Sequence, residues 1–351
     1  MKGPEAQYRW MGILACRALP PLFLIGLILS AGCTGSLVKG GAVVAPHIVP
    51  VEGAADPPRP SYSFPFEDMT VTLSMPVDGP VYAGAKAADK EVTIYGNVSE
   101  SAWIAESYLS MINDPNQEPF YSDLQGQLRK VKGNAGLSDD EFVDLMAVFV
   151  QTIPYETTPE NPAKFPIETF AEKAGDCDDK SLLLAALLSR EGYRTALLSF
   201  PEESHMAVGI VCNGAEYRNT GYAYIETTNV SYVGVPPDSL DGDIVLNSNP
   251  IVIPVGNGNR TYGACDETTF LHTVYVKSEN RFTDLTRQAD SLQAELRALS
   301  GRGDAATYNR EIAAYNSLIA EMKRVAQIHN YVAGHQYDRK GTYAWANSHP
   351  L

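Results

Sequence analysis

The sequence predicts an α+β fold in which a buried helix packs on an antiparallel sheet and a helical hairpin follows. The first observation is an apolar helix over residues 177–191. The second is a set of three strand-like runs directly after it, over residues 194–200, 205–212 and 222–227. The third is a heptad repeat of apolar residues that begins near residue 282. A helix followed by an antiparallel sheet is typical of the α+β class.

The helix over residues 177–191 is predicted to pack on the sheet. Leu182, Leu183 and Leu187 recur at helical spacing, which gives the helix an apolar face. Gly192 then offers the backbone freedom that commonly ends a helix. Short turns rich in Gly, Asn and Pro separate the three strands that follow, so these strands are predicted to form an antiparallel sheet.

A second helix is predicted to begin at Ser138. Ser138 and Glu141 have the spacing of a capping box, and the two aspartates between them suit the positive end of a helix dipole. Apolar residues then recur at helical spacing until the pair Ile153-Pro154, which is predicted to end the helix.

Residues 62–136 are predicted to form a smaller α+β segment that leads into a core over residues 137–276. The residues alternate as in strands, and a helix is expected near residues 101–111. Gly79-Pro80 is predicted to form a turn. The predicted strands are residues 69–75, 81–82 and 92–95.

Residues 280–334 are predicted to form an antiparallel helical hairpin with coiled-coil spacing, followed by a tail over residues 335–351. Gly301-Arg302-Gly303 interrupts the apolar repeat, and Asp304 can cap a new helix. One interpretation is an arm that binds a partner or a second copy of the chain. The other is a brace that packs on the core, since apolar stripes usually indicate packing.

Residues 1–33 have the pattern of an export signal. Basic residues precede a short apolar run, and small residues then lead to Cys33. The stretch Leu-Ser-Ala-Gly-Cys that ends at Cys33 resembles the lipoprotein box of a prokaryotic lipoprotein, in which the cysteine receives a lipid. A plain secretory signal or a signal anchor is the alternative. Either way, the protein is expected outside the cytoplasm, and lipid or a signal anchor would tether it to the membrane.

Residues 34–61 are rich in Gly, Ala, Val and Pro, and they are predicted to be a flexible tether. Order is expected to begin near Tyr62. The formal net charge of the whole chain is −15. A chain this acidic is a poor partner for nucleic acids, because phosphate groups would repel it.

Three cysteines remain after the signal: Cys177, Cys212 and Cys265. An odd number in an exported chain suggests one functional thiol and one disulfide. Cys212 and Cys265 are the candidate bridge, because oxidising compartments favour such bonds. Two buried free thiols are the alternative.

Cys177, His205 and Glu226 are the candidate active site. The predicted helix begins at Cys177, where unpaired N–H groups favour a thiolate, although three neighbouring aspartates oppose it. His205 opens a strand, and a hairpin with the next strand would bring Glu226 close to it. A thiol, an imidazole and a carboxylate in this relation suit a nucleophile, a base and a group that orients the base.

Three segments around these residues resemble the signature segments of transglutaminase-like domains. They are Gly-Asp-Cys-Asp-Asp-Lys-Ser at Cys177, Ser-His-Met-Ala-Val at His205 and Tyr-Ile-Glu-Thr-Thr at Glu226. The resemblance covers residues 137–230 and implies a papain-like core. It makes Cys177 the nucleophile, His205 the base and Glu226 the orienting group. The family more often has aspartate at the third position, so Glu226 is a departure.

The resemblance implies a cysteine enzyme that cleaves or transfers amide bonds through a thioester. The expected substrate is a protein, a peptide or cell-envelope material. No cofactor and no metal is expected, because the histidines lack the spacing of zinc ligands and the aspartates lack an EF-hand pattern. The alternative function is a catalytically silent, surface-tethered module that binds a partner.

Overall fold

The structure is a computed structural model that describes residues 35–38, 40–157, 162–240, 243–299 and 305–351. The predicted export signal and Cys33 lie outside these residues. The described part is a mixed fold of helices and antiparallel sheets, which confirms the predicted α+β class. None of its helices combines the length and the apolar character needed to cross a bilayer.

The central sheet has four antiparallel strands in the order β8-β7-β6-β9. The first three match the runs predicted from the sequence. The fourth, β9, was not predicted, and it pairs with β6 at an edge of the sheet, where Pro254 is tolerated. The strands are β6 Thr195–Phe200, β7 His205–Ile210, β8 Ala223–Ile225 and β9 Ile251–Val255.

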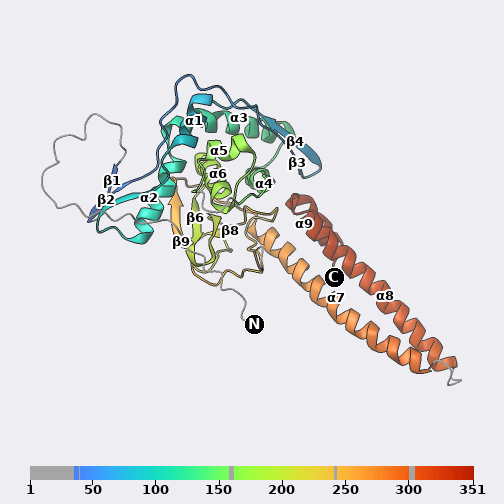
Figure 1. Cartoon of the computed structure of the whole chain (residues 1–351). Coiled ribbons are helices and arrows are strands. Elements are labelled where there is room, and N and C mark those ends of the chain that lie inside the picture. The colour runs from blue at the N-terminus through green and yellow to red at the C-terminus, as the bar shows by residue number, and fades with distance from the viewer. Residues whose placement is uncertain (1–34, 39, 158–161, 241–242, 300–304) are drawn as a thin grey trace, which may run out of the picture.

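Helix α6 (Cys177–Arg190) matches the helix predicted over residues 177–191, and most of its residues are buried. It packs on one face of the sheet, where Met206 and Val208 join the main core. Helices α4 (Asp139–Gln151) and α5 (Pro166–Glu172) pack against α6, as Figure 1 shows. The start of α4 has the predicted capping box. Leu198, Phe200, Ala207 and Tyr224 form a second, smaller cluster with Leu246.

The N-terminal segment contradicts its prediction at α1, and strand β3 and helix α3 were not predicted. Residues 79–87 were expected to hold a turn and a short strand, but they form α1 (Gly79–Ala87). The reason is local, because Asp78 caps the helix through Val81 N and Pro80 is compatible with its first turn. The remaining elements are β3 Ser61–Phe66, β4 Met69–Ser74, α2 Glu100–Ile112, η1 Pro115–Gln117 and α3 Glu118–Ala135.

The predicted tether over residues 34–61 is wrong for its first part. This part contributes two strands to a three-stranded antiparallel sheet, in the order β1-β2-β5. Val43 is fully buried there, and Ile48 N donates to the Asp114 carboxylate at 2.6 Å. The composition suggested a linker, but the two short runs pair with each other and the second also pairs with β5. The strands are β1 Gly35–Val38, β2 Gly41–Val44 and β5 Thr93–Gly96.

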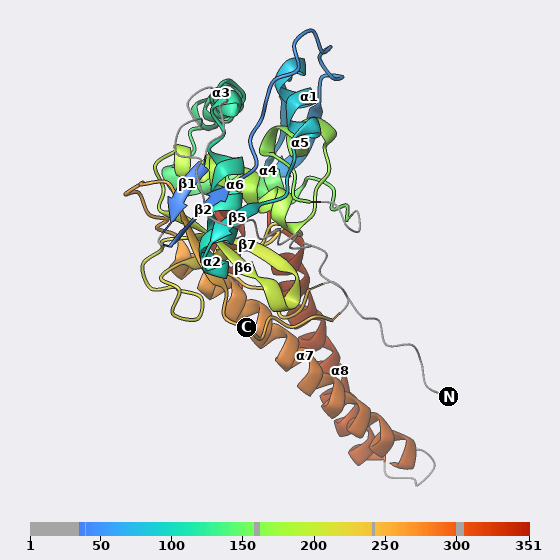
Figure 2. The ribbon, with the colours of Figure 1, turned by 60° about the vertical axis from the view of Figure 1, so that its left-hand side comes forward.

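The C-terminal helices α7 (Cys265–Leu299) and α8 (Ala305–Gly334) lie side by side and confirm the predicted hairpin. Figures 1 and 2 show that the hairpin extends well beyond the sheet. Helix α7 starts earlier than predicted, inside the expected core. The predicted tail is wrong, because it contains α9 (Arg339–Ser348), which Asp338 caps and which packs on the hairpin.

A disulfide joins Cys212 to Cys265, with a Cα–Cα distance of 6.4 Å. Cys212 follows strand β7, and Cys265 is the first residue of α7. The bridge therefore anchors the base of the hairpin to the central sheet. Cys177 is the free cysteine in the described part of the chain.

Replacing both Cys212 and Cys265 with serine is expected to lower the free energy of unfolding by about 4 kcal/mol. The bridge spans 53 residues, and its loss frees that loop in the unfolded chain. Urea unfolding of the oxidised wild type and the double variant measures the difference. An unchanged urea midpoint would indicate that both residues are free thiols in the native protein.

Candidate active site

Cys177 is the first residue of α6, and its position depends on a cap formed by two aspartates. The Asp176 carboxylate accepts from Asp179 N, and the Asp179 carboxylate accepts from Asp176 N, each at 3.3 Å. Lys164 N also donates to Asp179 at 2.6 Å. These contacts fix the helix start, so the sulfur of Cys177 has a defined place in the fold.

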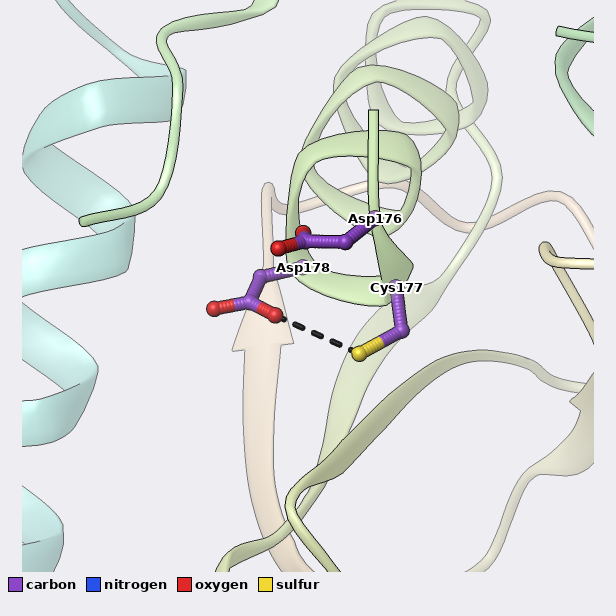
Figure 3. Close-up of side chains that lie close together, drawn as sticks. All are labelled: Asp176, Cys177 and Asp178. Atoms are coloured by element: carbon purple, nitrogen blue, oxygen red, sulfur yellow. Dashed lines mark hydrogen bonds between the residues drawn. The ribbon is translucent and has the colours of Figure 1, made fainter. Parts of the chain in front are cut away.

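The Cys177 sulfur lies beside the start of strand β7. The thiol donates to Asp178 Oδ1 at 3.3 Å, as Figure 3 shows, and its sulfur is 3.9 Å from Ser204 O. The Met206 N–H also bonds the sulfur and favours its ionised form. Ser204 and Met206 are the neighbours of His205 in the sequence, so the sulfur contacts the backbone just before and just after the candidate base. The side chain is only 6% exposed.

The surroundings of Cys177 keep its thiol protonated at neutral pH. Burial raises the pKa of Cys177 well above its usual value, and the carboxylates of Asp178 and Asp176 raise it further. This agrees with the expectation that the acidic neighbours oppose a thiolate. A base is therefore needed before the sulfur can act as a nucleophile.

His205 and Glu226 form a buried pair on the sheet. His205 Nε2 lies 3.3 Å from Glu226 Oε2, and both side chains are almost fully buried. Tyr224 joins them, because its hydroxyl donates to Glu226 Oε2 at 2.7 Å and lies 3.0 Å from His205 Nε2. The imidazole, the phenol and the carboxylate thus make one closed network.

The Glu226 carboxylate is held in its ionised form. Burial raises the pKa of Glu226, but the His205 ring and the Thr228 N–H and hydroxyl outweigh it and bring the pKa to about 2. Oε1 accepts from Thr227 N at 2.9 Å, from Thr228 N at 2.8 Å and from Thr228 Oγ1 at 2.7 Å. A buried carboxylate with this many donors stays charged and acts as an acceptor only.

This network determines which imidazole nitrogen carries the proton when His205 is neutral. Burial and Glu226 raise the pKa of Tyr224 well above its usual value, so the phenol stays protonated. Its hydroxyl therefore donates a hydrogen bond to Glu226. Nε2 of His205 must then be the donor to Tyr224 and Glu226. The lone pair is left on Nδ1, which is the nitrogen available to accept a proton from another group.

The pairing of β7 with β8 explains how Glu226 reaches His205. The sequence placed Glu226 roughly opposite His205, but Val208 pairs with Ile225, and this register places Ala207 opposite Glu226. The offset is two residues, so His205 and Glu226 are diagonal neighbours on the same face of the sheet. The longer side chain of glutamate suits this diagonal approach.

The structure brings His205 and Glu226 together, but Cys177 is placed differently from the prediction of a closed triad. Among the described contacts, the sulfur bonds to Asp178 and to the backbone beside His205, and not to the imidazole ring. Helix α6 packs on the face that carries Met206, whereas His205 packs with Phe200 and Tyr224 on the other face. Catalytic hydrogen bonds are often long before substrate binds.

Three contacts of the site were not predicted, although Tyr224 and Lys180 stand in the segments that drew attention. The two-residue period of a strand puts Tyr224 on the same face as Glu226, which was a usable signal. Lys180, whose Nζ donates to Thr228 O at 3.3 Å, stands two residues before the apolar run of the same helix. No sequence signal indicated Tyr108, whose hydroxyl lies 3.4 Å from Asp178 Oδ2.

Asp176, Cys177 and Asp178 also bring three potential metal ligands within 4.8 Å of one another. Figure 3 shows the three side chains at the start of α6. Metal binding by cysteine requires the thiolate, and the raised pKa of Cys177 works against that form. The thiol–carboxylate hydrogen bond accounts for the closest of these contacts.

No family model matches the chain, and no curated protein matches it. Among solved structures, one protein from Cytophaga hutchinsonii, described provisionally as a cysteine protease, is similar at 12% identity and a TM-score of 0.26. The match covers 64% of this chain and 78% of that protein. A TM-score this low assigns neither a fold nor an activity to the chain.

Asp178→Asn is expected to lower the pKa of the Cys177 thiol and so to speed its alkylation by iodoacetamide at pH 7 by about tenfold. The reason is that a carboxylate next to the sulfur disfavours the thiolate. The alkylation rate, read by peptide mapping across pH, measures the effect. Asp123→Asn, at an exposed position, is the matched control. An alkylation profile that does not move in Asp178→Asn would contradict this account of the thiol.

Proposed function

We propose that this protein is an exported, transglutaminase-like cysteine enzyme that hydrolyses or transfers amide bonds. Cys177 is the nucleophile, His205 is the general base and acid, and Glu226 orients the imidazole. One observation carries the proposal: the buried His205–Glu226 pair lies at the start of β7, and the Cys177 sulfur contacts the backbone on both sides of His205. A helix N-terminus beside a histidine with an ionised partner suits nucleophilic catalysis.

The first step forms a bond between Cys177 Sγ and the carbonyl carbon of an amide. The thiol proton moves to His205 Nδ1, and the carbonyl oxygen becomes an oxyanion. His205 then returns the proton to the leaving nitrogen as the C–N bond breaks, which leaves a thioester on Cys177. Water or an amine attacks the thioester and releases the acyl group, again with His205 as the base.

Glu226 contributes by holding the imidazole while it becomes charged. Its ionised carboxylate accepts a hydrogen bond from the Nε2–H group, so it stabilises the imidazolium that forms during attack. Tyr224 supports the same geometry from within the network. The backbone N–H of Cys177 lies in the first turn of α6, where N–H groups have no acceptor within the helix, and it is suited to bind the oxyanion.

The thiol is only weakly reactive in the resting site. In the resting site the Cys177 thiol donates a hydrogen bond to Asp178, and its pKa is raised. Entry of an amide displaces this bond, so the sulfur turns toward His205 Nδ1.

Export is part of the proposal. Cys33 would carry a lipid, and the domain would act on protein, peptide or cell-envelope amides outside the membrane. The Cys212–Cys265 disulfide is consistent with an oxidising compartment. Mass spectrometry of the mature N-terminus decides between a lipidated Cys33 and a plain secretory signal.

The alternative function is a silent, surface-tethered binding module. Two observations favour it: the thiol is buried beside a carboxylate that opposes its ionisation, and the hairpin of α7 and α8 extends beyond the sheet. In that case the network around Glu226 would only stabilise the fold.

A substrate screen of the wild type beside Cys177→Ala separates the two functions. Peptide and envelope fractions are incubated with each protein, and mass spectrometry detects cleaved or newly joined amides. We expect products from the wild type only, and at least 100-fold slower turnover in His205→Ala, because general base catalysis contributes about 100-fold or more. Equal product formation by Cys177→Ala, or a covalent adduct on another residue, would overturn the proposed mechanism.

A further inference from the structure

Lys180 is a charged residue in the middle of the core. Its side chain is 0% exposed, and the residues that follow it on α6 are mostly apolar. Lysine is almost never fully buried without partners, because removing an ammonium from water is costly. Burial lowers the pKa of Lys180 to about 8, so the side chain is still mainly protonated at pH 7.

The partners of Lys180 are main-chain carbonyls. Its Nζ donates to Gln151 O at 3.1 Å, to Ile153 O at 2.7 Å and to Thr228 O at 3.3 Å. Three acceptors satisfy the three N–H bonds of an ammonium group. Two of the carbonyls lie at the C-terminal end of α4, where the helix dipole also favours a positive charge.

The third carbonyl connects Lys180 to the turn that holds Glu226. The same Thr228 donates its N–H and its hydroxyl to Glu226 Oε1. Gln151 makes a second connection, because its carbonyl accepts from Lys180 while its Nε2 donates to Glu226 O at 2.8 Å. Lys180 therefore contacts one residue that binds the backbone of Glu226 and one that binds its carboxylate.

Lys180 also belongs to the helix that carries Cys177. Residues three positions apart on a helix lie on the same side, so Lys180 lies on the Cys177 side of α6, about one turn further along the helix. The helix start is fixed by its aspartate cap. Through Lys180, the rigid helix of the nucleophile is joined to the turn that sets the direction of the Glu226 carboxylate.

We infer that Lys180 is a positioning residue of the proposed active site: its ammonium joins the Cys177 helix to the Glu226 turn, and this holds Glu226 against His205 Nε2. The inference rests on the proposed function. A hydrophobic side chain would fill the same space in the core, but it would leave the Thr228 and Gln151 carbonyls without this donor.

The test measures the alkylation of Cys177 by iodoacetamide from pH 5 to pH 10 in the full mature protein. Wild type is expected to react at pH 7 about tenfold faster than His205→Ala, because the imidazole assists removal of the thiol proton. Lys180→Met should lose most of this advantage, and its pH profile should move up toward that of His205→Ala. Peptide mapping assigns the label to Cys177.

Leu187→Ala is the matched control for stability. Leu187 is fully buried on the same helix, and its truncation destabilises the core by about 2–5 kcal/mol. It is expected to keep the wild-type pH profile, because it has no hydrogen bond to the Glu226 turn. Lys180→Gln, which keeps amide donors but no charge, is expected to give a profile between wild type and Lys180→Met, and it serves if Lys180→Met does not fold.

The outcomes distinguish failure of the proposed function from failure of the role proposed for Lys180. If His205→Ala reacts like wild type at every pH, the proposed function fails. If His205→Ala is slow but a folded Lys180→Met or Lys180→Gln keeps the wild-type profile, the role of Lys180 is overturned and the function stands. If Leu187→Ala moves the profile as far as Lys180→Met does, loss of stability explains the effect and the role of Lys180 is again overturned.

Discussion

The arrangement of the site depends on the hydrogen bonds that hold the ionised carboxylate of Glu226. A buried charge is stable only when hydrogen bonds replace the water it has lost. Here Thr227 and Thr228 bind one oxygen, while Tyr224 and His205 bind the other. Because the carboxylate can only accept, it dictates the direction of each donor, including the imidazole proton. The chemical role of His205 follows from that direction.

The fold places two opposed influences on Cys177. The start of α6 and the Met206 N–H favour a thiolate, whereas burial, Asp178 and Asp176 disfavour it, and the second group is stronger. The thiol is therefore protonated, and its sulfur contacts Asp178 and the backbone beside His205. In the proposed mechanism, Asp178 must release the thiol before the sulfur can reach the imidazole.

Much of the fold could be predicted because its signals are periodic and local. The capping box at Ser138, the apolar helix after Cys177 and the heptad spacing near residue 282 each report one element and need no knowledge of its neighbours. The missed helix α1 has a local cap, whereas two other failures came from tertiary pairing. Strand β9 contains Pro254 and is ordered by β6. Residues 35–44 have the composition of a linker, but β1 pairs with β2 and β2 pairs with β5.

The site shows the same division. Cys177, His205 and Glu226 could be selected because their residue types and chain order suit one chemistry. The supporting residues could not be assigned in the same way, because Lys180 binds main-chain carbonyls and any residue can supply a carbonyl. The contact of the sulfur with Asp178 rather than the imidazole also depends on how α6 sits on the sheet.

The most direct test of the central claim is the position of the proton on neutral His205. Nitrogen-15 NMR of protein labelled in the imidazole rings distinguishes Nδ1–H from Nε2–H, and the signal absent from His205→Ala identifies the residue. The network around Glu226 predicts a proton on Nε2 in the wild type and a mixture of both forms in Glu226→Gln. A proton on Nδ1 in the wild type would contradict the account, because His205 could not then accept a proton from Cys177 through that nitrogen.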